Sequence, residues 1–259
     1  MRLSSLVSLS RCLGSSQEQA KASAETFDSL PERSFTMISL IDLGLSSVAL
    51  ICLSPLFLLA AAGIRLSSPG PIFYRAKRVG IGGKIFTMYK FRTMHVNHGA
   101  AGSCITAQND SRVFAFGSWL RGCKIDELPQ LLNILRREMS IVGPRPEDPK
   151  IVENHYNSDQ LETLRIRPGL SSPGSIYYYT HGEKTLNGKD PEGEYVERLL
   201  PVKLALDLIY VREVSVLYSL RVILRTIWVV SATALGKRDF PDPREMSKAR
   251  HLGLIPKSL

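Results

Sequence analysis

The longest apolar stretch of the chain lies near its N-terminal end and contains a pair that breaks helices. From Leu43 to Ile64 no residue carries a charge. At about 1.5 Å of rise per residue, a straight helix of that length would cover about 33 Å, which matches a bilayer core of about 30 Å. Ser54-Pro55 interrupts the stretch, and a proline inside a helix removes a hydrogen bond and clashes with the preceding turn. The pattern therefore predicts two helical limbs that meet at Ser54 and Pro55.

The limbs differ in length, and their flanks do not fix an orientation. Residues 37–53 and 55–64 would form limbs of about 25 Å and about 15 Å, and the second cannot span a bilayer alone. Arg33 precedes the segment and Arg65 follows it, with further cations at 75–78. Because positive residues favour the cytoplasmic side, both ends can face the cytoplasm. From these residues alone, a re-entrant helix and a kinked span both remain open.

The rest of the chain predicts a mainly helical α+β fold with a small β-hairpin and amphipathic interfacial helices. Residues that favour strands flank the glycines at 80–83, so a hairpin is expected within 78–94. Arg221 and Arg225 lie on one face of the last long helix, which argues for an interfacial or packed helix and against a second span. The Gly-, Ser- and Tyr-rich stretch 171–189 is expected to be a loop. Helices are expected at 113–120, from 126 onwards, at 158–164, at 196–211 and at 214–235.

Composition and charge narrow the partners. The chain has 33 Lys and Arg against 24 Asp and Glu, a net charge of +9, which suits anionic membrane surfaces or phosphorylated substrates. Zinc-finger spacing, an RNA-binding aromatic motif and long basic runs are absent from the sequence, so nucleic acid is not an expected partner. The cysteines are scattered and predict free thiols, at positions 12, 52, 104 and 123.

Candidate chemistry concentrates between 124 and 146. Asp126 and Glu127 are adjacent, and Arg145 lies between two prolines. Carboxylates can share a metal ion with phosphate oxygens, and a guanidinium binds phosphate in a two-pronged fashion. Taken alone, however, the acid pair is explained better by an aspartate that caps a helix with a glutamate in the first turn.

Three further cations accompany this stretch. Lys90 and Arg92 alternate with Phe91, so on a strand they would share a face, either as phosphate ligands or as a solvated basic edge. Arg121 lies shortly before the acid pair. Arginine is well suited to phosphate recognition, although each of these residues alone is explained by an ordinary surface charge.

Taken together in their order, these motifs resemble a known family, the bacterial sugar transferases, or monotopic polyprenyl-phosphate phosphoglycosyl transferases. The resemblance runs from about residue 35 to 235 and covers most of the chain. It rests on Ser54-Pro55, SPGPIFY followed by KRVG (68–80), YKFRTM (89–94), IDELPQLLNIL (125–135), SIVGPRP (140–146) and RPGL (167–170). No single motif is decisive, but the ordered set is specific.

The resemblance implies an enzyme that transfers a sugar 1-phosphate from a UDP-sugar to a polyprenyl phosphate, usually undecaprenyl phosphate, and releases UMP. Such enzymes catalyse the first membrane step of a bacterial polysaccharide or glycoconjugate pathway. By resemblance, Asp126 would be the nucleophile that forms a phosphosugar-aspartyl intermediate, and Glu127 would help to bind Mg²⁺. Lys90, Arg92, Arg121 and Arg145 would bind substrate phosphates.

Composition and the resemblance together predict how the chain is organised. The composition of residues 1–35 predicts a polar, mobile leader, which is additional to the family pattern, and residues 236–259 are expected to form a polar tail. The resemblance implies a re-entrant membrane helix (36–66), broken at Ser54-Pro55, and a catalytic domain (67–235) that faces the cytoplasm at the bacterial inner membrane. The partners would be the UDP-sugar, the polyprenyl phosphate and the lipid bilayer.

This chain departs from the family pattern in three places. Gly122-Cys123-Lys124 stands where Lys-Thr or Lys-Ser usually precedes the acid pair, and Arg137-Glu138 replaces Gly-Asp. After RPG, the run LSSPGSIYYYTHGE replaces the usual Trp-Ala-Gln-Val, so the sequence does not predict the sugar.

The alternative function is a basic protein that docks on membranes without catalysing a reaction.

Overall fold

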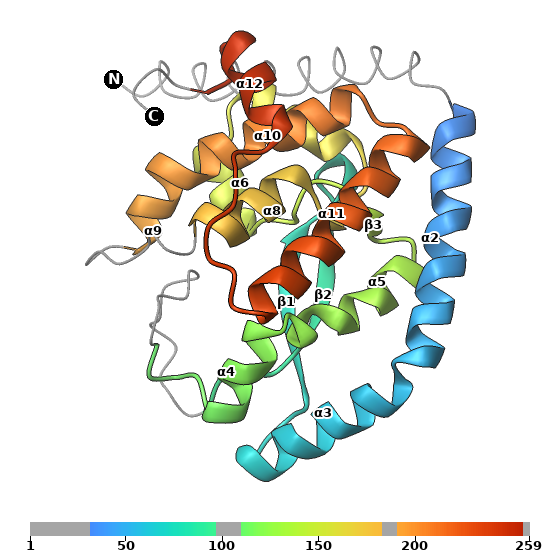
Figure 1. Cartoon of the computed structure of the whole chain (residues 1–259), viewed down its shortest axis with the longest axis vertical. Coiled ribbons are helices and arrows are strands. Elements are labelled where there is room, and N and C mark those ends of the chain that lie inside the picture. Colours follow the sequence, from blue (N-terminus) through green and yellow to red (C-terminus); the bar gives the residue numbers. More distant parts are fainter. Residues whose placement is uncertain (1–31, 97–109, 183–190, 256–259) are drawn as a thin grey trace, which may run out of the picture. The chain divides into compact units, whose positions relative to one another are not determined.

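The computed structural model describes residues 32–96, 110–182 and 191–255. The molecule divides between Thr36 and Met37, and the arrangement below concerns the part from Met37 onwards. That part is mainly helical, with one antiparallel and one parallel sheet of two strands each (Figure 1). The predicted α+β class, dominated by helices, is therefore confirmed.

The predicted break in the apolar segment is present, and local hydrogen bonding explains it. Two separate helices, α2 (Glu32–Cys52) and α3 (Ser54–Ser67), meet there. Pro55 has no N–H to give to the carbonyl of Ile51, four residues earlier. The Ser54 hydroxyl donates to that carbonyl instead, at 2.8 Å. Helix α2 thus ends at Cys52 and α3 begins at Ser54, and the two helices meet at an angle (Figure 1).

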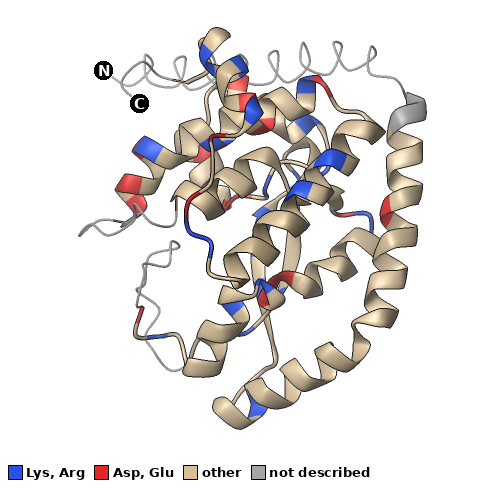
Figure 2. Cartoon of the chain, viewed as in Figure 1, with Lys and Arg blue, Asp and Glu red and all other residues tan. Residues whose placement is uncertain are grey.

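Most of the predicted leader, residues 1–31, lies outside the described residues, and residues 32–35 already belong to α2. Two helices in the described part are long and apolar enough to cross a membrane, Phe35–Cys52 in α2 and α11 (Val216–Ala234). Figure 2 shows that α2 and α3 carry few charged residues. Large apolar side chains are exposed on both long helices, including Leu40 and Val48 on α2. Such apolar surface suits contact with lipid.

The predicted hairpin begins earlier than expected. Strands β1 (Phe73–Val79) and β2 (Ile85–Phe91) pair antiparallel. The short 3-10 turn η2 (Ile81–Gly83) joins them, and both Gly82 and Gly83 have positive φ. Because side chains disfavour this left-handed backbone, glycine suits the turn. The glycine-rich run is thus a hairpin turn.

The acid pair lies on a 3-10 segment, not at the start of the predicted α-helix. The chain leaves α4 (Ala115–Gly122), enters η3 (Ile125–Gln130) and continues into α5 (Leu131–Leu135). Lys124 precedes η3 with a left-handed φ of 56°, and no side chain caps the start. Asp126 lies inside the segment, so the interpretation of Asp126 as a helix cap is wrong.

A short parallel sheet, which the sequence did not predict, brings two motifs together. Strand β3 (Ser140–Val142) pairs with β4 (Gly169–Ser171), so SIVGPRP lies beside RPGL. The Gly143 N–H extends the pairing by donating to the Ser171 carbonyl at 2.9 Å. A Cβ on Gly169 would overlap the backbone of Gly143. Glycine is therefore required where the two motifs touch.

The prediction that 171–189 forms a loop is wrong for its described part. After β4 the chain forms α8 (Pro173–Tyr177) and a π-helical turn, η5 (Tyr178–Gly182), while 183–190 lie outside the described residues. Ser172 caps α8 by accepting from the Ser175 N–H at 2.9 Å. A serine followed by a proline is an ordinary helix start, and the glycine-rich composition hid it.

The C-terminal part packs around one buried helix, α10 (Leu200–Arg212). The segment 236–259, predicted to be a polar tail, contains α12 (Arg244–His251), whose Met246 and Ala249 pack against α10. Two apolar residues in a polar stretch were too weak a pattern to predict this helix. The remaining helices are α6 (Pro149–His155), α7 (Ser158–Leu161), η4 (Glu162–Arg165), α9 (Pro191–Glu194) and η6 (Tyr195–Leu199). The free thiols are confirmed for Cys52 and Cys123.

Candidate active site

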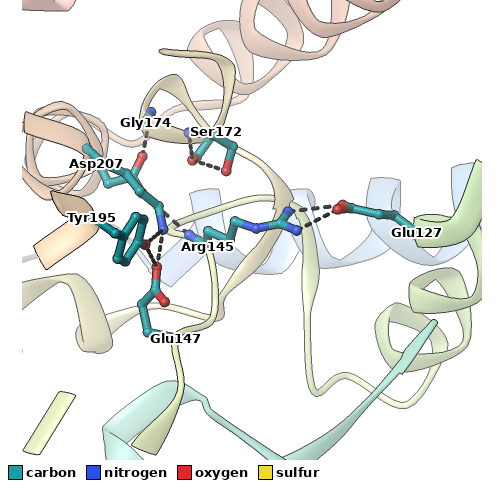
Figure 3. A network of polar contacts seen from close by, with 9 residues as sticks. Glu127, Arg145, Glu147, Ser172, Gly174, Tyr195 and Asp207 are labelled. Carbon is teal, nitrogen blue, oxygen red and sulfur yellow. Dashed lines mark hydrogen bonds and ion pairs between the residues drawn. The ribbon is translucent and has the colours of Figure 1, made fainter. Parts of the chain in front are cut away.

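The site centres on the Glu127 carboxylate, which forms ion pairs with Lys90 and Arg145, two cations that are far apart in the sequence. The Arg145 guanidinium donates to both carboxylate oxygens, with Nη1–Oε2 at 3.0 Å and Nη2–Oε1 at 2.5 Å (Figure 3). The Lys90 ammonium donates to Oε1 at 3.2 Å. The side chains are only 14–23% exposed. Charge-assisted, two-pronged pairs of this kind are among the stronger hydrogen bonds in proteins.

Asp126 lies next to this cluster and is 8% exposed. Within the described part of the chain, its Oδ1 atom is buried without a hydrogen-bond partner, and so are both amide atoms of Gln130. Buried polar atoms without partners are rare in folded proteins and call for an explanation. A carboxylate oxygen with free lone pairs, beside a cluster of cations, is suited to react with or to bind a charged ligand.

Burial and neighbouring charges push the two carboxyl groups in different directions. Burial alone would raise the pKa of Glu127, but Arg145 and Lys90 more than offset it and hold the pKa well below its usual range. Burial raises the pKa of Asp126, and the charge of Glu127 raises it further, against the opposing effect of Lys90. Pairs of acids with divergent pKa values are a pattern of sites that divide chemical roles.

Lys90 owes its position to an asparagine that links strand β2 to α5, the helix that follows the acid pair. The Asn133 side chain accepts from the Tyr89 N–H at 3.0 Å and donates to the Thr87 carbonyl at 2.7 Å. These bonds fasten α5 along the edge of β2, and β2 then presents Lys90 to Glu127. Burial lowers the pKa of Lys90, although the Glu127 carboxylate opposes this shift.

Arg145 is held by backbone contacts on both sides. The Gly169 N–H donates to the Pro144 carbonyl at 2.8 Å, and the Val79 N–H donates to the Glu147 carbonyl at 3.0 Å. The extended segment after β3 is therefore fastened to β4 and to β1. It directs the guanidinium towards Glu127 (Figure 3).

The other predicted site residues do not all join this cluster. Arg121, in the last turn of α4, is near enough for its charge to lower the pKa of Asp126 in part. Arg92 follows β2, is 5% exposed, and donates to the carbonyls of Ser68 and Pro69 at 2.6 and 2.8 Å. It therefore does not share a face with Lys90, because its side chain braces the turn after α3.

The residues fit a magnesium ion that arrives with a phosphate-bearing substrate. Among the described residues, no group of three His, Cys, Asp or Glu gathers into a metal site. Mg²⁺, however, commonly uses one or two carboxylates and completes its shell with phosphate oxygens and water. Asp126 offers an unpaired oxygen, and Glu127 retains lone pairs beyond those that Arg145 and Lys90 engage.

Sequence reasoning missed Asn133 and Gln130. Each is a polar residue inside the apolar run LPQLLNIL, and each is fully buried. A polar residue on the buried face of an amphipathic helix needs a partner. A polar residue on the apolar face of this predicted helix was therefore the signal that could have pointed to both residues.

A buried Asp126, a partly buried Glu127, a guanidinium and an ammonium gather in one cluster, whose chemistry suits the binding of phosphate groups. Residues 33–233 match the family model described as bacterial sugar transferase, and the chain belongs to that family.

Named relatives show what the family includes. The chain is 37% identical over 191 residues to a UDP-glucose:undecaprenyl-phosphate glucose-1-phosphate transferase of Xanthomonas campestris pv. campestris, covering 70% of this chain and 36% of that protein. It is 32% identical over 199 residues to a UDP-N-acetylgalactosamine-undecaprenyl-phosphate N-acetylgalactosaminephosphotransferase of Aeromonas hydrophila, covering 76% and 44%. It is 38% identical over 204 residues to the exopolysaccharide production protein ExoY of Sinorhizobium fredii (strain NBRC 101917 / NGR234), covering 72% and 81%. The chain thus spans less than half of the first two relatives and most of the third.

Proposed function

We propose that this protein transfers a sugar 1-phosphate from a UDP-sugar to undecaprenyl phosphate and releases UMP, as the first membrane step of exopolysaccharide or related glycan synthesis. The observation that carries the proposal is the buried, unpaired oxygen of Asp126 beside a Glu127 held by Arg145 and Lys90, in a chain of the bacterial sugar transferase family. The names of its relatives supply the donor and acceptor classes.

In the first step, the Asp126 carboxylate attacks the β-phosphorus of the UDP-sugar. The bond between that phosphorus and the bridging oxygen breaks, and UMP leaves with the oxygen. The sugar phosphate is then an acyl phosphate on Asp126. The raised pKa of Asp126 makes its ionised carboxylate more basic, which favours attack on phosphorus. Arg145, Lys90 and Arg121 supply positive charge where the transferring phosphoryl group gains negative charge.

In the second step, a phosphate oxygen of undecaprenyl phosphate attacks the same phosphorus and displaces the Asp126 carboxylate. The product is undecaprenyl diphosphosugar, and Asp126 regains its starting form. Splitting the transfer in two lets a soluble donor and a lipid acceptor use one site in turn. Mg²⁺, held by Asp126 or Glu127 with the diphosphate, would neutralise charge on the phosphate oxygens.

We also propose that α2 and α3 enter the bacterial inner membrane from the cytoplasmic face and return to it. The break at Ser54-Pro55 supports this path, as do the cations on both flanks. The second helix, Ser54–Ser67, would be about 21 Å long, too short for a bilayer core of about 30 Å. The catalytic domain would then face the cytoplasm.

The test is UMP release by the full chain in detergent or nanodiscs, with Mg²⁺ and a panel that includes UDP-glucose and UDP-N-acetylgalactosamine. Asp126→Asn should abolish UMP release, and mass spectrometry of the wild type with donor alone should find a phosphosugar on Asp126. Asp159→Asn, at an exposed acid on α7, is the matched control and should retain activity. Near-normal turnover by Asp126→Asn would refute the nucleophile. Liposome binding without UMP release from any donor would favour a binding protein instead.

A further inference from the structure

Helix α10 carries two buried charged residues among positions that are almost all apolar and buried. Lys203 is 2% exposed and Asp207 is 0% exposed. They lie four residues apart, which places them on one face of the helix. The same helix packs its Leu206 and Ile209 against α12, so the charged face points away from that apolar cluster.

The two charged side chains reach the segment that carries Arg145. Lys203 Nζ donates to Glu147 Oε1, and the Tyr195 hydroxyl donates to the same oxygen at 2.6 Å. Asp207 Oδ2 accepts from the Arg145 N–H at 3.4 Å. The buried polar network therefore holds the chain at Arg145 and two residues beyond it, as Figure 3 shows.

Asp207 also contacts a second element, the helix α8. Its Oδ1 accepts from the Gly174 N–H at 2.8 Å, in the first turn of α8. A Cβ at position 174 would come too close to the Lys203 carbonyl and to Asp207 Oδ1. The close approach of α8 to α10 thus depends on glycine, and it lets one carboxylate join α8, α10 and the Arg145 segment.

Burying the Asp207 carboxylate is costly for the fold. Burial raises the pKa of Asp207 to about 6, against the opposing effects of Lys203, Ser172 and the N–H groups of Gly174 and Arg145. A raised pKa means that stability is lost as the pH rises through that value, so the carboxylate that is ionised at neutral pH costs folding free energy. Replacing buried ion pairs by apolar residues is often neutral or stabilising. A cost of this kind points to a role beyond stability.

We propose that Asp207 and Lys203 are positioning residues, which fix the backbone on both sides of Arg145 so that its guanidinium stays aligned with Glu127 and with the transferring phosphate. Among the described contacts neither residue reaches the acid pair, so Asp207 acts through the Arg145 backbone and Lys203 acts through Glu147, two residues further along the chain. The proposal rests on the proposed function for its consequence in catalysis. Its structural part is that the two residues hold the segment 143–148 in place, and this part can be tested without any measurement of activity.

Hydrogen–deuterium exchange of the full chain tests the structural part. Asp207→Asn replaces one of the two carboxylate oxygens by an NH₂ group, which cannot accept a hydrogen bond. One of the N–H groups of Gly174 and Arg145 then loses its acceptor, so amide exchange in the peptide around 143–148 should rise. Tyr195→Phe, which removes only one hydroxyl, should raise it less. Ile209→Val, on the opposite face of α10, is the matched control and should leave this peptide unchanged. Exchange that is unchanged in Asp207→Asn would overturn the proposal.

A double-mutant cycle on UMP release tests the catalytic part. Because a misplacement of about 1 Å can cost about 10²-fold in rate, Asp207→Asn should lower kcat/KM at least about tenfold, mostly through kcat. In an Arg145→Lys background the same change should cost less than about twofold, since residues that act as a unit are non-additive. Equal losses in both backgrounds would overturn the assignment to Arg145. If the wild type releases no UMP from any donor, the proposed function fails, whereas the exchange result still decides the positioning.

Discussion

Removing the Arg145 guanidinium should destabilise the protein mainly through the carboxylate that it leaves behind. In Arg145→Met, Glu127 stays 14% exposed and keeps only Lys90, at 3.2 Å. Breaking one side of a buried pair costs about 3–5 kcal/mol, and partial solvent access with the remaining lysine favours the lower end, about 3 kcal/mol. In a domain of this size, 1 kcal/mol corresponds to about 2–4 °C in Tm. The melting temperature at pH 7 should therefore fall by about 6–12 °C.

The loss should depend on pH in a specific direction. Arg145 and Lys90 overcome the effect of burial and hold the pKa of Glu127 well below its ordinary value of 4.5. An acid with a depressed pKa contributes stability above its unfolded pKa and loses it as the pH falls through the folded value. Without Arg145, burial dominates and the pKa of Glu127 rises. The difference in Tm between wild type and Arg145→Met should thus be largest at pH 7 and shrink towards pH 4.

The cycle with Glu127→Gln isolates the pair. Thermal unfolding is followed by circular dichroism at one scan rate in one detergent, for both single variants and the double variant. The double variant should be more stable than additivity predicts by about 2 kcal/mol, or about 4–8 °C. Arg212→Met, at an exposed two-pronged pair with Glu162, is the matched control and should cost about 0–1 kcal/mol. Additive losses, or a loss that is the same at pH 4 and pH 7, would refute the reasoning.

Two further outcomes are expected. Arg92→Met removes the hydrogen bonds to the carbonyls of Ser68 and Pro69, so it should lower Tm while UMP release per folded molecule stays within about threefold; a far larger loss of turnover at normal stability would return Arg92 to substrate binding. In a cysteine-free background, Ser34→Cys and Leu66→Cys should both react with a membrane-impermeant thiol reagent only from the cytoplasmic side of inverted vesicles. Labelling from opposite sides would contradict the re-entrant path.

Local rules were sufficient where one residue type determines the backbone. Pro55 must break a helix, and Gly82 and Gly83 favour a tight turn, so the α2–α3 break and the hairpin were predictable. The pairing of β3 with β4 was not, because each strand has three residues and the contact depends on Gly143 meeting a distant glycine. Short strands with long-range partners leave almost no periodic pattern in the sequence.

The residues of the candidate site also differ in how far the sequence predicted them. The ordered motifs predicted Asp126, Glu127 and Arg145 as site residues, and the structure brings the last two into direct contact. The alternation of Lys90 and Arg92 did not predict their different surroundings, because β2 ends at Phe91 and the chain then turns inward. The motifs also did not predict the buried polar residues that hold the Arg145 segment. Lys203 and Asp207 read as an ordinary solvated pair until the burial of α10 is known.

The apolar segment is tied to the site by a charge that looks misplaced in the sequence. Asp42 lies in α2, where a charged residue at bilayer depth would cost about 2.5–3.5 kcal/mol on insertion scales. Its carboxylate accepts from the Ser140 hydroxyl at 2.6 Å and from the Ile141 N–H at 3.1 Å, so it is satisfied by β3 and not by lipid. Strand β3 continues directly into the segment of Arg145. The apolar helix α2 and the arginine that pairs with Glu127 are therefore joined through a few residues of extended chain.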